Sequence, residues 1–478
     1  MTTSALPVFS DFVDGTAAAA GGKTFDLIAP QDNRVIGRIA ESGQAGVDRA
    51  VMAAAAAFAA NRKQPTHQRI TWLRNAAAAL LGASKEIAAL ICEDVGKPIR
   101  IATGEVKRGA EFLEATAAAL TQLGGETLPL DITATGVGHM GYVRHMPYGV
   151  VAGITPFNAP VNLLVQKVAP AIAAGNAIVV KPAPAATRTA LRLAQLFEEA
   201  GWPRNLFTVV TGDRDSAAAL AAHPEARAVS FTGSTAGGDA LAAAAKAKKF
   251  VAELGSNAAN IVMADADVGT AAKKIAAAAF EASGQQCISA QRILVARSVL
   301  DAFVEQFVAA AKTLNVGDAT DPKTDVGPMV AKASADRVMS MCADAIGKGA
   351  RYALEPRQSG ALVSPGILVD VSKGAQLWQD EVFGPIALVT PFDNIEDALR
   401  LANDSPFGLQ GAVFTRDLAA VLRFADDFDV GALWVNEATR FRLDIYPFGG
   451  MKRSGVGREG VRYAIEEMSQ LKFIGITV

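Results

Sequence analysis

The feature that most constrains the fold is an alternation of short strand-like runs with Ala-rich helical segments in the middle of the chain. Four runs rich in β-branched and aromatic residues are expected to be buried strands: residues 149–154, 177–180, 206–210 and 228–231. The expected helices between them span residues 160–175, 186–200 and 217–223. This alternation predicts an α/β fold with a parallel sheet and crossover helices. Ligands of such sheets bind at the carboxyl ends of the strands.

The first hundred residues are expected to be mainly helical, and α/β alternation returns over residues 254–448. Helical spacing of apolar residues occurs at 46–60, 69–81 and 84–95. A chain of 478 residues is long enough for two or three domains. Its net charge of -2 gives no reason to expect a nucleic-acid partner.

Two observations bear on location. No uninterrupted apolar run reaches membrane-spanning length. The N-terminal segment Met1–Pro7 lacks the basic region and apolar core of a signal peptide. We therefore expect no membrane association and a cytoplasmic, reducing setting.

Only three cysteines occur, and one of them stands in a distinctive context. Cys92 and Cys342 have apolar helical neighbours, which indicates small core hydrophobes. Cys287 follows Gly284 and two Gln residues, which suits an approachable turn, and Glu253 upstream offers a base. From this spacing alone, a buried structural thiol is the better interpretation. Neither a disulfide framework nor a metal site is indicated.

Several strand ends carry polar or Gly-rich segments. The turn 231–238 is not a Walker A loop, because Asp239 stands where Lys is needed, and it is not G-x-G-x-x-G. Its amides suit a phosphate at a helix start, although a helix cap is an equally good interpretation. Lys181 closes a strand, where a solvated lysine is usual. The Asn158 amide can donate to an oxyanion, or it can cap a helix that begins near Pro160.

The segment 447–460 is more specific than these turns. It holds five glycines in fourteen residues, which costs much chain entropy unless tight backbone turns are required. Phe448 and Met451 stand within it, which is unlike a flexible linker.

With these segments in view, the sequence resembles the aldehyde dehydrogenase family over nearly its whole length. Seven motifs occur in family order: Pro156-Phe157-Asn158, Lys181-Pro182, Phe231-Thr232-Gly233-Ser234-Thr235, Glu253-Leu254-Gly255-Ser256, Gly284-Gln285-Gln286-Cys287, Glu381-Val382-Phe383-Gly384-Pro385 and Pro447-Phe448-Gly449-Gly450. The resemblance reverses the interpretation of Cys287 as a structural thiol.

The resemblance implies the aldehyde dehydrogenase fold, with a Rossmann-like cofactor domain, an α/β catalytic domain and a β-strand oligomerisation arm. The NAD(P)-binding domain is expected at residues 1–121 and 143–253, and the catalytic domain at 254–448. Residues 122–142 and 449–478 are expected to form the arm and the C-terminal segment. Because an exposed strand edge invites pairing with another subunit, a homodimer or homotetramer is expected.

The resemblance also implies catalytic roles. Cys287 attacks the aldehyde, and the Asn158 amide with the Cys287 backbone N–H holds the oxyanion. Loss of hydride to the nicotinamide leaves a thioester, which water hydrolyses with Glu253 as general base. Lys167 and Glu459 match positions that relay the proton.

Cofactor contacts follow by the same resemblance: Ile154, Thr155, Phe157, Lys181, Ala183, Pro184, Gly212, Arg214, Phe231, Gly233, Ser234, Leu254, Gly255, Glu381 and Phe383. Two of these depart from the common pattern. Pro184 replaces a carboxylate that holds the adenosine 2′-OH, so we expect NADP to be accepted alongside NAD. Phe157 replaces a Trp and keeps an apolar wall.

The acyl pocket is implied at eight positions: Ala159, Leu163, Gln166, Gln286, Ile288, Arg440, Arg442 and Phe448. Arg442 resembles the branch acting on lactaldehyde and phosphonoacetaldehyde, and its guanidinium suits a substrate with one anionic group. The alternative is that Arg442 pairs with Asp444 or Glu437 and never meets the substrate.

Two other functions compete with a hydrolytic dehydrogenase. A CoA-acylating semialdehyde dehydrogenase typically lacks a base such as Glu253, because water must not take the thioester. A non-catalytic structural or binding member of the family usually loses the nucleophile, the base or the oxyanion Asn, and all three are present here.

Overall fold

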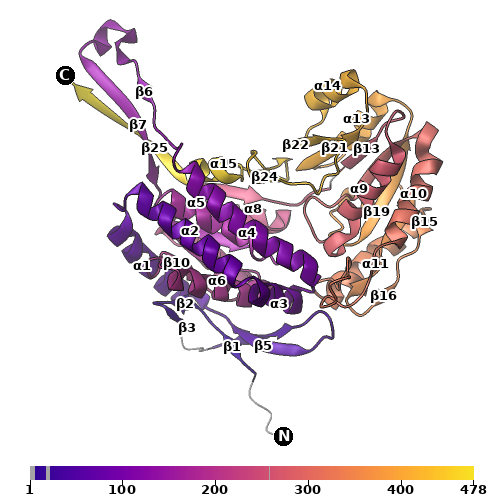
Figure 1. Ribbon diagram of the computed structural model, residues 1–478, viewed down its shortest axis with the longest axis horizontal. Helices are drawn as coiled ribbons and strands as arrows, with labels where there is room; N and C mark the ends of the chain where they lie inside the picture. Colours follow the sequence, from indigo (N-terminus) through magenta and orange to yellow (C-terminus); the bar gives the residue numbers. More distant parts are fainter. Residues whose placement is uncertain (1–5, 18–21, 258) are drawn as a thin grey trace.

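The structure is a computed structural model, and it describes residues 6–17, 22–257 and 259–478. Most of the N-terminal segment considered for a signal peptide lies outside the described residues. Figure 1 shows two α/β bodies side by side, with a narrow arm projecting from one of them.

The first body is built on an eight-stranded sheet with the order β24-β12-β11-β8-β9-β10-β2-β3. Its five central strands are mutually parallel: β8 (Val150–Thr155), β9 (Ala177–Pro182), β10 (Phe207–Val209), β11 (Ala226–Thr232) and β12 (Lys249–Glu253). Short antiparallel strands close the edges: β2 (Phe12–Val13), β3 (Thr16–Ala17) and β24 (Gly455–Val456). The four strands predicted from sequence are therefore confirmed.

Helices connect these strands: α5 (Asn162–Ala173), α6 (Thr187–Glu199), α7 (Arg214–Ala222) and α8 (Thr235–Ala245). The predicted helices correspond to α5, α6 and α7. α7 begins earlier than expected, so Arg214 is the first residue of this helix rather than part of a loop. α5 is buried along its whole length, which makes it a rigid support for side chains near the sheet edge.

The N-terminal region is only partly helical, which corrects the expectation for the first hundred residues. Before residue 43 the described chain forms, besides β2 and β3 of the first sheet, a separate three-stranded sheet of β1 (Val8–Phe9), β5 (Val35–Ala40) and β4 (Thr24–Ile28). The predicted helices follow as α1 (Gly43–Asn61), α2 (Thr66–Gly82) and α3 (Ser84–Val95), then α4 (Ile99–Ala119). The two-residue strands β1, β2 and β3 carry too little pattern to be predicted, whereas β4 and β5 are five and six residues long, pair with each other, and were overlooked.

The second body is a seven-stranded sheet with the order β15-β18-β19-β14-β13-β21-β22. Its strands are β13 (Ala259–Val262), β14 (Arg292–Ala296), β15 (Arg351–Leu354), β18 (Gly366–Val369), β19 (Ile386–Phe392), β21 (Gln410–Phe414) and β22 (Ala432–Val435). Only β15 pairs antiparallel with its neighbour among these described strands. The main helices are α9 (Val268–Phe280), α10 (Leu300–Lys312), α11 (Lys332–Gly347), α13 (Ile395–Asn403) and α14 (Leu418–Asp427).

The arm is a three-stranded sheet of β6 (Thr127–Leu128), β7 (His139–Pro147) and β25 (Ser469–Thr477). β25 pairs with β7 over nine residues and leaves apolar side chains in solvent, with Leu471 68% and Phe473 51% exposed. The homo-oligomer stays a prediction, and a monomeric mass in light scattering at micromolar concentration would contradict it.

Within the described residues, no single helix is long and apolar enough to cross a bilayer. α2 and α3 reach that length and composition only as a pair, which is bent by 70°.

Candidate active site

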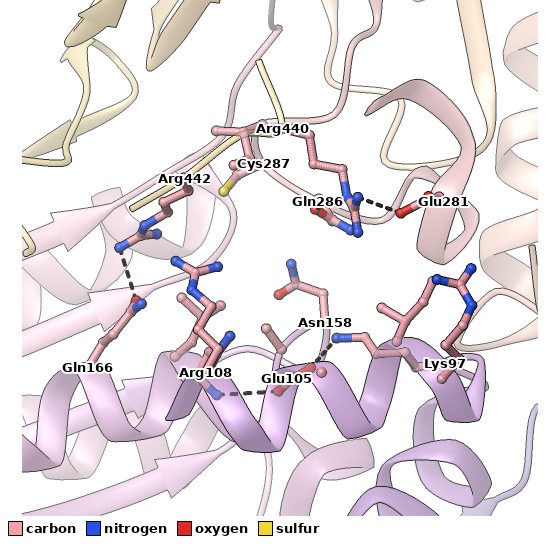
Figure 2. Close-up of a pocket in the computed structure, with 17 residues that line it drawn as sticks. Lys97, Glu105, Arg108, Asn158, Gln166, Glu281, Gln286, Cys287, Arg440 and Arg442 are labelled. Atoms are coloured by element: carbon pink, nitrogen blue, oxygen red, sulfur yellow. Dashed lines mark hydrogen bonds and ion pairs between the residues drawn. The ribbon is translucent and has the colours of Figure 1, made fainter. Parts of the chain in front are cut away.

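Two cavities meet at Cys287. The first has a volume of about 320 Å³ and the second about 330 Å³, and both are lined by Asn158, Leu163 and Cys287. A thiol at the junction of two cavities can be approached by one molecule from each side. Figure 2 shows the first cavity, with the Cys287 sulfur and the Asn158 amide directed into it.

The turn before Cys287 has an unusual backbone. Ala282 and Ser283 adopt positive φ angles of 52° and 60°, and Gly284 follows with 63°. Left-handed backbone at two residues that are not glycine costs about 1–3 kcal/mol each and persists where the surroundings enforce it. Here the Ser283 hydroxyl donates to the Gly327 carbonyl at 2.7 Å, and a Cβ on Gly284 would lie 2.2 Å from the Gly384 carbonyl oxygen. The Gly before the two Gln residues is therefore required by packing.

The Cys287 thiol is only partly exposed, and its surroundings disfavour the thiolate. Burial, followed by the nearby Glu253 carboxylate, raises the pKa of Cys287 to about 12. Arg442 acts in the opposite direction. Burial also raises the pKa of Glu253 well above its usual range, and the Glu459 carboxylate raises it further. A base with a raised pKa is suited to accepting a proton near neutral pH.

Asn158 follows the end of β8 and is buried. The alternative interpretation as a helix cap is wrong, because α5 begins at Asn162 and its N-terminal cap position is Val161. The buried Glu105 of α4 accepts hydrogen bonds from the backbone N–H groups of Val161 and Asn162, at 2.8 and 3.3 Å. This contact secures the chain between β8 and α5, so the Asn158 amide is held at the cavity junction.

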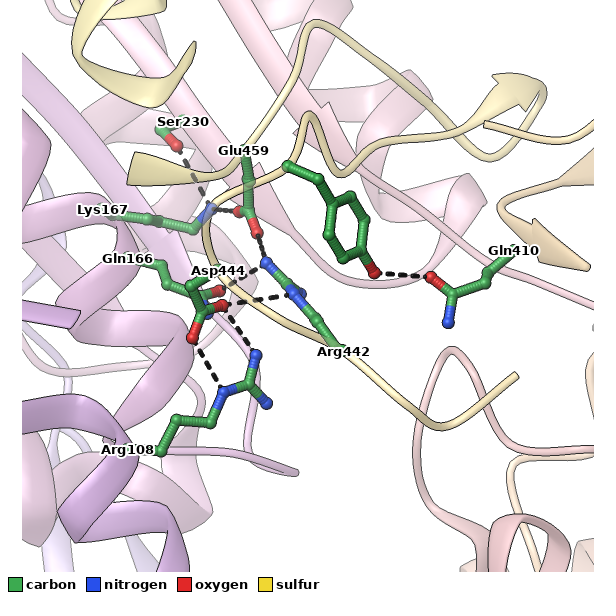
Figure 3. A network of polar contacts seen from close by, with 9 residues as sticks. Arg108, Gln166, Lys167, Ser230, Gln410, Arg442, Asp444 and Glu459 are labelled. Atoms are coloured by element: carbon green, nitrogen blue, oxygen red, sulfur yellow. Dashed lines mark hydrogen bonds and ion pairs between the residues drawn. The ribbon is translucent and has the colours of Figure 1, made fainter. Parts of the chain in front are cut away.

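Lys167 and Glu459 form a buried ion pair with an N–O distance of 3.3 Å, and Lys167 also donates to the Ser230 hydroxyl at 3.2 Å. The other oxygen of Glu459 accepts from Arg442 at 3.1 Å. Figure 3 shows this chain of contacts continuing to Asp444. The structure thus brings together the two residues that the resemblance assigned to a proton relay.

Seven of the eight positions predicted for the acyl pocket line the first cavity. The exception is Phe448, which is buried behind the wall and packs with Ile288 and Leu409. Its ring lies under the Arg442 guanidinium, 3.6 Å from the central carbon. Arg442 pairs with Asp444 at 3.5 Å, as the alternative proposed, yet it still lines the cavity, while Glu437 pairs with Lys274 instead.

The contribution of α4 and the residues just before it to this wall was not predicted from the sequence. Six residues from that region line the first cavity: Lys97, Arg100, Ile101, Gly104, Glu105 and Arg108. They lie far upstream of the catalytic motifs, and only the tertiary fold brings them near Cys287. The Arg100 and Arg108 side chains were the one available signal, since they recur on one helix face two turns apart.

The second cavity is lined by six of the predicted cofactor contacts: Phe157, Gly233, Ser234, Leu254, Glu381 and Phe383. Gly233 permits close approach there, because an added Cβ would lie 2.5 Å from the Phe231 ring. The Ser234 hydroxyl caps α8 by accepting from the Gly237 N–H at 3.2 Å, so the interpretation as a helix cap is confirmed, and phosphate binding stays a prediction. Arg337 of α11 lines the cavity as well and was not anticipated.

The remaining predicted cofactor contacts lie along the same edge of the sheet: Ile154, Thr155, Lys181, Ala183, Pro184, Gly212, Arg214, Phe231 and Gly255. Lys181 is buried at the end of β9, and burial lowers its pKa to about 8, an effect that Asp213 and Glu41 partly offset. Arg214 is exposed. Glu41 was missed: it accepts from the Asp213 N–H at 2.8 Å and contacts the Ser216 hydroxyl.

A Pro184→Glu variant is expected to shift cofactor selectivity toward NAD by at least about tenfold, because a carboxylate accepts from a ribose hydroxyl and repels a 2′-phosphate. The wild type should use NADP at a rate at least comparable with NAD. Specificity constants for both cofactors measure this. A wild type strongly selective for NAD, with no change in the variant, would show that residue 184 does not set the choice.

The sequence model described as "Aldehyde dehydrogenase family" matches residues 17–474. A 3-sulfolactaldehyde dehydrogenase of Priestia aryabhattai is 39% identical over 409 residues, covering 85% of this chain and 86% of that enzyme. A lactaldehyde dehydrogenase of Methanocaldococcus jannaschii is 35% identical over 471 residues, covering 98% of this chain and 100% of that enzyme.

Solved structures agree with the sequence relatives. The NADP-dependent glyceraldehyde-3-phosphate dehydrogenase of Bacillus halodurans C-125, complexed with NADP, has a TM-score of 0.95 and 31% identity, covering 98% of this chain and 99% of that one. The fold expected from the motifs is therefore confirmed. The chain belongs to the aldehyde dehydrogenase family and is an NAD(P)-dependent aldehyde dehydrogenase.

Proposed function

We propose that the enzyme oxidises a small aldehyde with one anionic group to the corresponding carboxylic acid, through a thiohemiacetal and a thioester on Cys287. The observation that carries this proposal is the charge of the first cavity. Its lining includes five cationic side chains and two carboxylates: Lys97, Arg100, Arg108, Arg440 and Arg442, with Glu105 and Glu281.

The two lining carboxylates offset only two of the five lining cations. Glu105 is paired with Lys97, and Glu281 with Arg440 at 2.5 Å. The partners of the other three arginines lie outside the lining: Asp325, Asp444 and Glu459. Burial lowers the pKa of Arg440 despite Glu281, and Arg100 and Arg108 lower it further. Cations that disfavour one another across a cavity favour an anionic ligand between them.

The two arginines best suited to that ligand are Arg108 and Arg440. Arg108 donates two hydrogen bonds to Asp444, at 2.9 and 2.7 Å, and Arg440 bonds to Gln286 and Glu281. A guanidinium has five N–H donors, so each retains donors for a substrate group. Figure 2 shows the Arg108 side chain directed from α4 toward Cys287, and the Arg440 side chain at the opposite wall beside Gln286 and directed toward Glu281. The sulfonate named in a relative's substrate is an anion of the proposed kind.

In the proposed reaction, Cys287 adds to the aldehyde carbon while the Asn158 amide donates to the developing oxyanion. Water takes the thiol proton as the carbon–sulfur bond forms, so that Glu253 acts only in the second half of the reaction. After oxidation, Glu253 removes a proton from water, which attacks the thioester and releases the acid. Lys167 and Glu459 then pass the proton from Glu253 toward solvent.

The residues of the second cavity fit a nicotinamide cofactor. They combine a helix start at α8, a glycine that permits close approach, and an apolar wall in which Phe157 meets Phe383 edge-on at 5.9 Å. When bound, the cofactor supplies the hydride acceptor. Glu381 accepts from the Ser256 N–H at 3.1 Å, and burial raises its pKa to about 8. Its carboxyl can therefore hold a ribose hydroxyl in either protonation state.

A CoA-acylating dehydrogenase is the competing reaction. The presence of Glu253 and the Glu459 relay favours hydrolysis over transfer to CoA. Turnover without CoA separates the two, because acid formation in its absence excludes the CoA-acylating reaction.

The experiment that tests the anionic substrate compares aldehydes of matched length, such as succinic semialdehyde with pentanal, in wild type and Arg440→Gln. The variant is expected to raise KM for the anionic aldehyde about 10- to 100-fold, which is the loss of one charge-assisted hydrogen bond. The KM for the neutral aldehyde should change little.

Arg462→Gln serves as the matched control, because Arg462 is exposed and bonds only to Glu466 among the described contacts. It should leave both KM values unchanged. Equal values for the two aldehydes in wild type, or an equal rise for both in Arg440→Gln, would contradict an anion site in this cavity.

A further inference from the structure

Arg442 touches both the substrate cavity and the proposed proton relay. Its side chain is buried, lines the first cavity, and donates to Glu459 at 3.1 Å and to the Gln166 side-chain oxygen at 3.1 Å. Figure 3 shows its guanidinium between Asp444 on one side and Glu459 on the other.

The position of this guanidinium is fixed from a third direction. Its central carbon lies 3.6 Å from the centre of the Phe448 ring. Phe448 in turn exchanges two backbone hydrogen bonds with Glu459, at 2.9 and 2.6 Å. The Phe448 ring therefore fixes where the Arg442 guanidinium lies relative to the Glu459 carboxylate. A planar guanidinium can stack and bond a carboxylate together, whereas an ammonium cannot.

We propose that Arg442 is a positioning residue that joins the substrate cavity to the general base, by holding the Glu459 carboxylate toward Lys167 and offsetting its negative charge at Glu253 and Cys287. This role rests on the proposed function and extends it. It also explains why an arginine stands in a cavity where Arg108 and Arg440 already face the substrate.

The charges around Arg442 and Glu459 support this assignment. Glu253 is affected by Glu459, which disfavours its ionised form, and by three cations that favour it: Arg442, Lys167 and Arg458. Arg442 faces four groups: Glu459, Asp444, Glu253 and Cys287. Their combined negative charge outweighs burial and raises the pKa of Arg442. Without this cation, the Glu459 carboxylate would keep Lys167 as its one ion-pair partner among the described residues.

The test measures the pH dependence of two steps in wild type and Arg442→Gln. Loss of the cation disfavours ionised Glu253 and the Cys287 thiolate, so both pKa values should rise. The pH midpoint of the steady-state deacylation rate should move up by about one unit or more. The rate constant for alkylation of Cys287 by iodoacetamide, followed by peptide mass spectrometry over about pH 7 to 9, should fall about tenfold at each pH, because a smaller fraction of the thiol is ionised.

Two variants separate this role from a structural one. Arg442→Lys keeps the charge, so its deacylation midpoint and alkylation rate constant should stay near the wild-type values even if turnover falls. Arg442→Gln combined with Glu459→Gln removes the opposing charge, so both quantities should return toward wild type. An unmoved deacylation midpoint with an unchanged alkylation rate constant in Arg442→Gln, or no return in the double variant, would overturn the proposal. Because alkylation requires no aldehyde, it decides the role of Arg442 even if the proposed substrate class fails.

Discussion

Cys287→Ala is expected to lose dehydrogenase turnover by at least about 10⁴-fold, the scale seen when a catalytic nucleophile is removed. The reason is geometric, since Cys287 is the thiol at the junction of the two cavities and Asn158 faces the same point. Cofactor binding should survive, because the second cavity keeps its remaining lining. Initial rates from NAD(P)H absorbance and cofactor titration by fluorescence measure the two effects.

Cys342→Ala is the matched control for this change. Cys342 is fully buried in the second body, and its thiol lies in the core of that sheet rather than at a cavity. Its loss should cost some stability and leave the rate per folded enzyme close to wild type. If Cys287→Ala retained substantial turnover, another nucleophile would be required and the assignment would fail.

Glu253→Gln is expected to separate the two halves of the reaction. Oxidation precedes hydrolysis, so the variant should still produce a burst of NAD(P)H equal to its active sites, followed by a steady-state rate about 10²–10⁴-fold below wild type. Stopped-flow absorbance at saturating aldehyde measures both phases. The structure supports this role through the buried position of Glu253 and its electrostatic contact with Glu459.

Glu459→Gln provides the comparison for Glu253→Gln. It removes the relay carboxylate and keeps the base, so its burst should remain and its steady-state loss should be smaller. Loss of the burst itself in Glu253→Gln would show that Glu253 is required to activate the thiol, and its assignment to hydrolysis alone would be wrong.

The strands and helices around the first sheet could be predicted because their signals are local. The run 177–180 is apolar and β-branched, and it became the core of β9, buried on both faces. The turn 231–238 could also be predicted from local residues, because its glycines and Ser234 indicate the end of a strand, a helix cap and the start of a helix. By contrast, β4 and β5 pair with each other and with β1 in a separate three-stranded sheet, and the two residues of β1 carry no pattern that indicates its parallel pairing with β5.

The candidate site likewise combines residues that could be predicted from local motifs with residues that only the fold brings together. Cys287, Glu253 and Asn158 stand in motifs whose residue types suit their chemistry, and the fold places two of them at the cavity junction. The α4 side chains Glu105 and Arg108 could not be assigned, because their contacts are with Val161 and Asp444, distant in sequence. For Arg442, the sequence offered two interpretations as alternatives, a substrate contact and a carboxylate pair. The structure shows that one guanidinium both lines the cavity and pairs with carboxylates.

The central claim is that the aldehyde carbon becomes an acyl group on Cys287, and rapid quenching of Glu253→Gln followed by peptide mass spectrometry tests it most directly. With cofactor and aldehyde present, the peptide carrying Cys287 should gain the mass of the aldehyde less two hydrogens, and this adduct should be absent without cofactor. The peptides carrying Cys92 and Cys342 should be unmodified. A full burst of NAD(P)H with an unmodified Cys287 peptide would contradict the account.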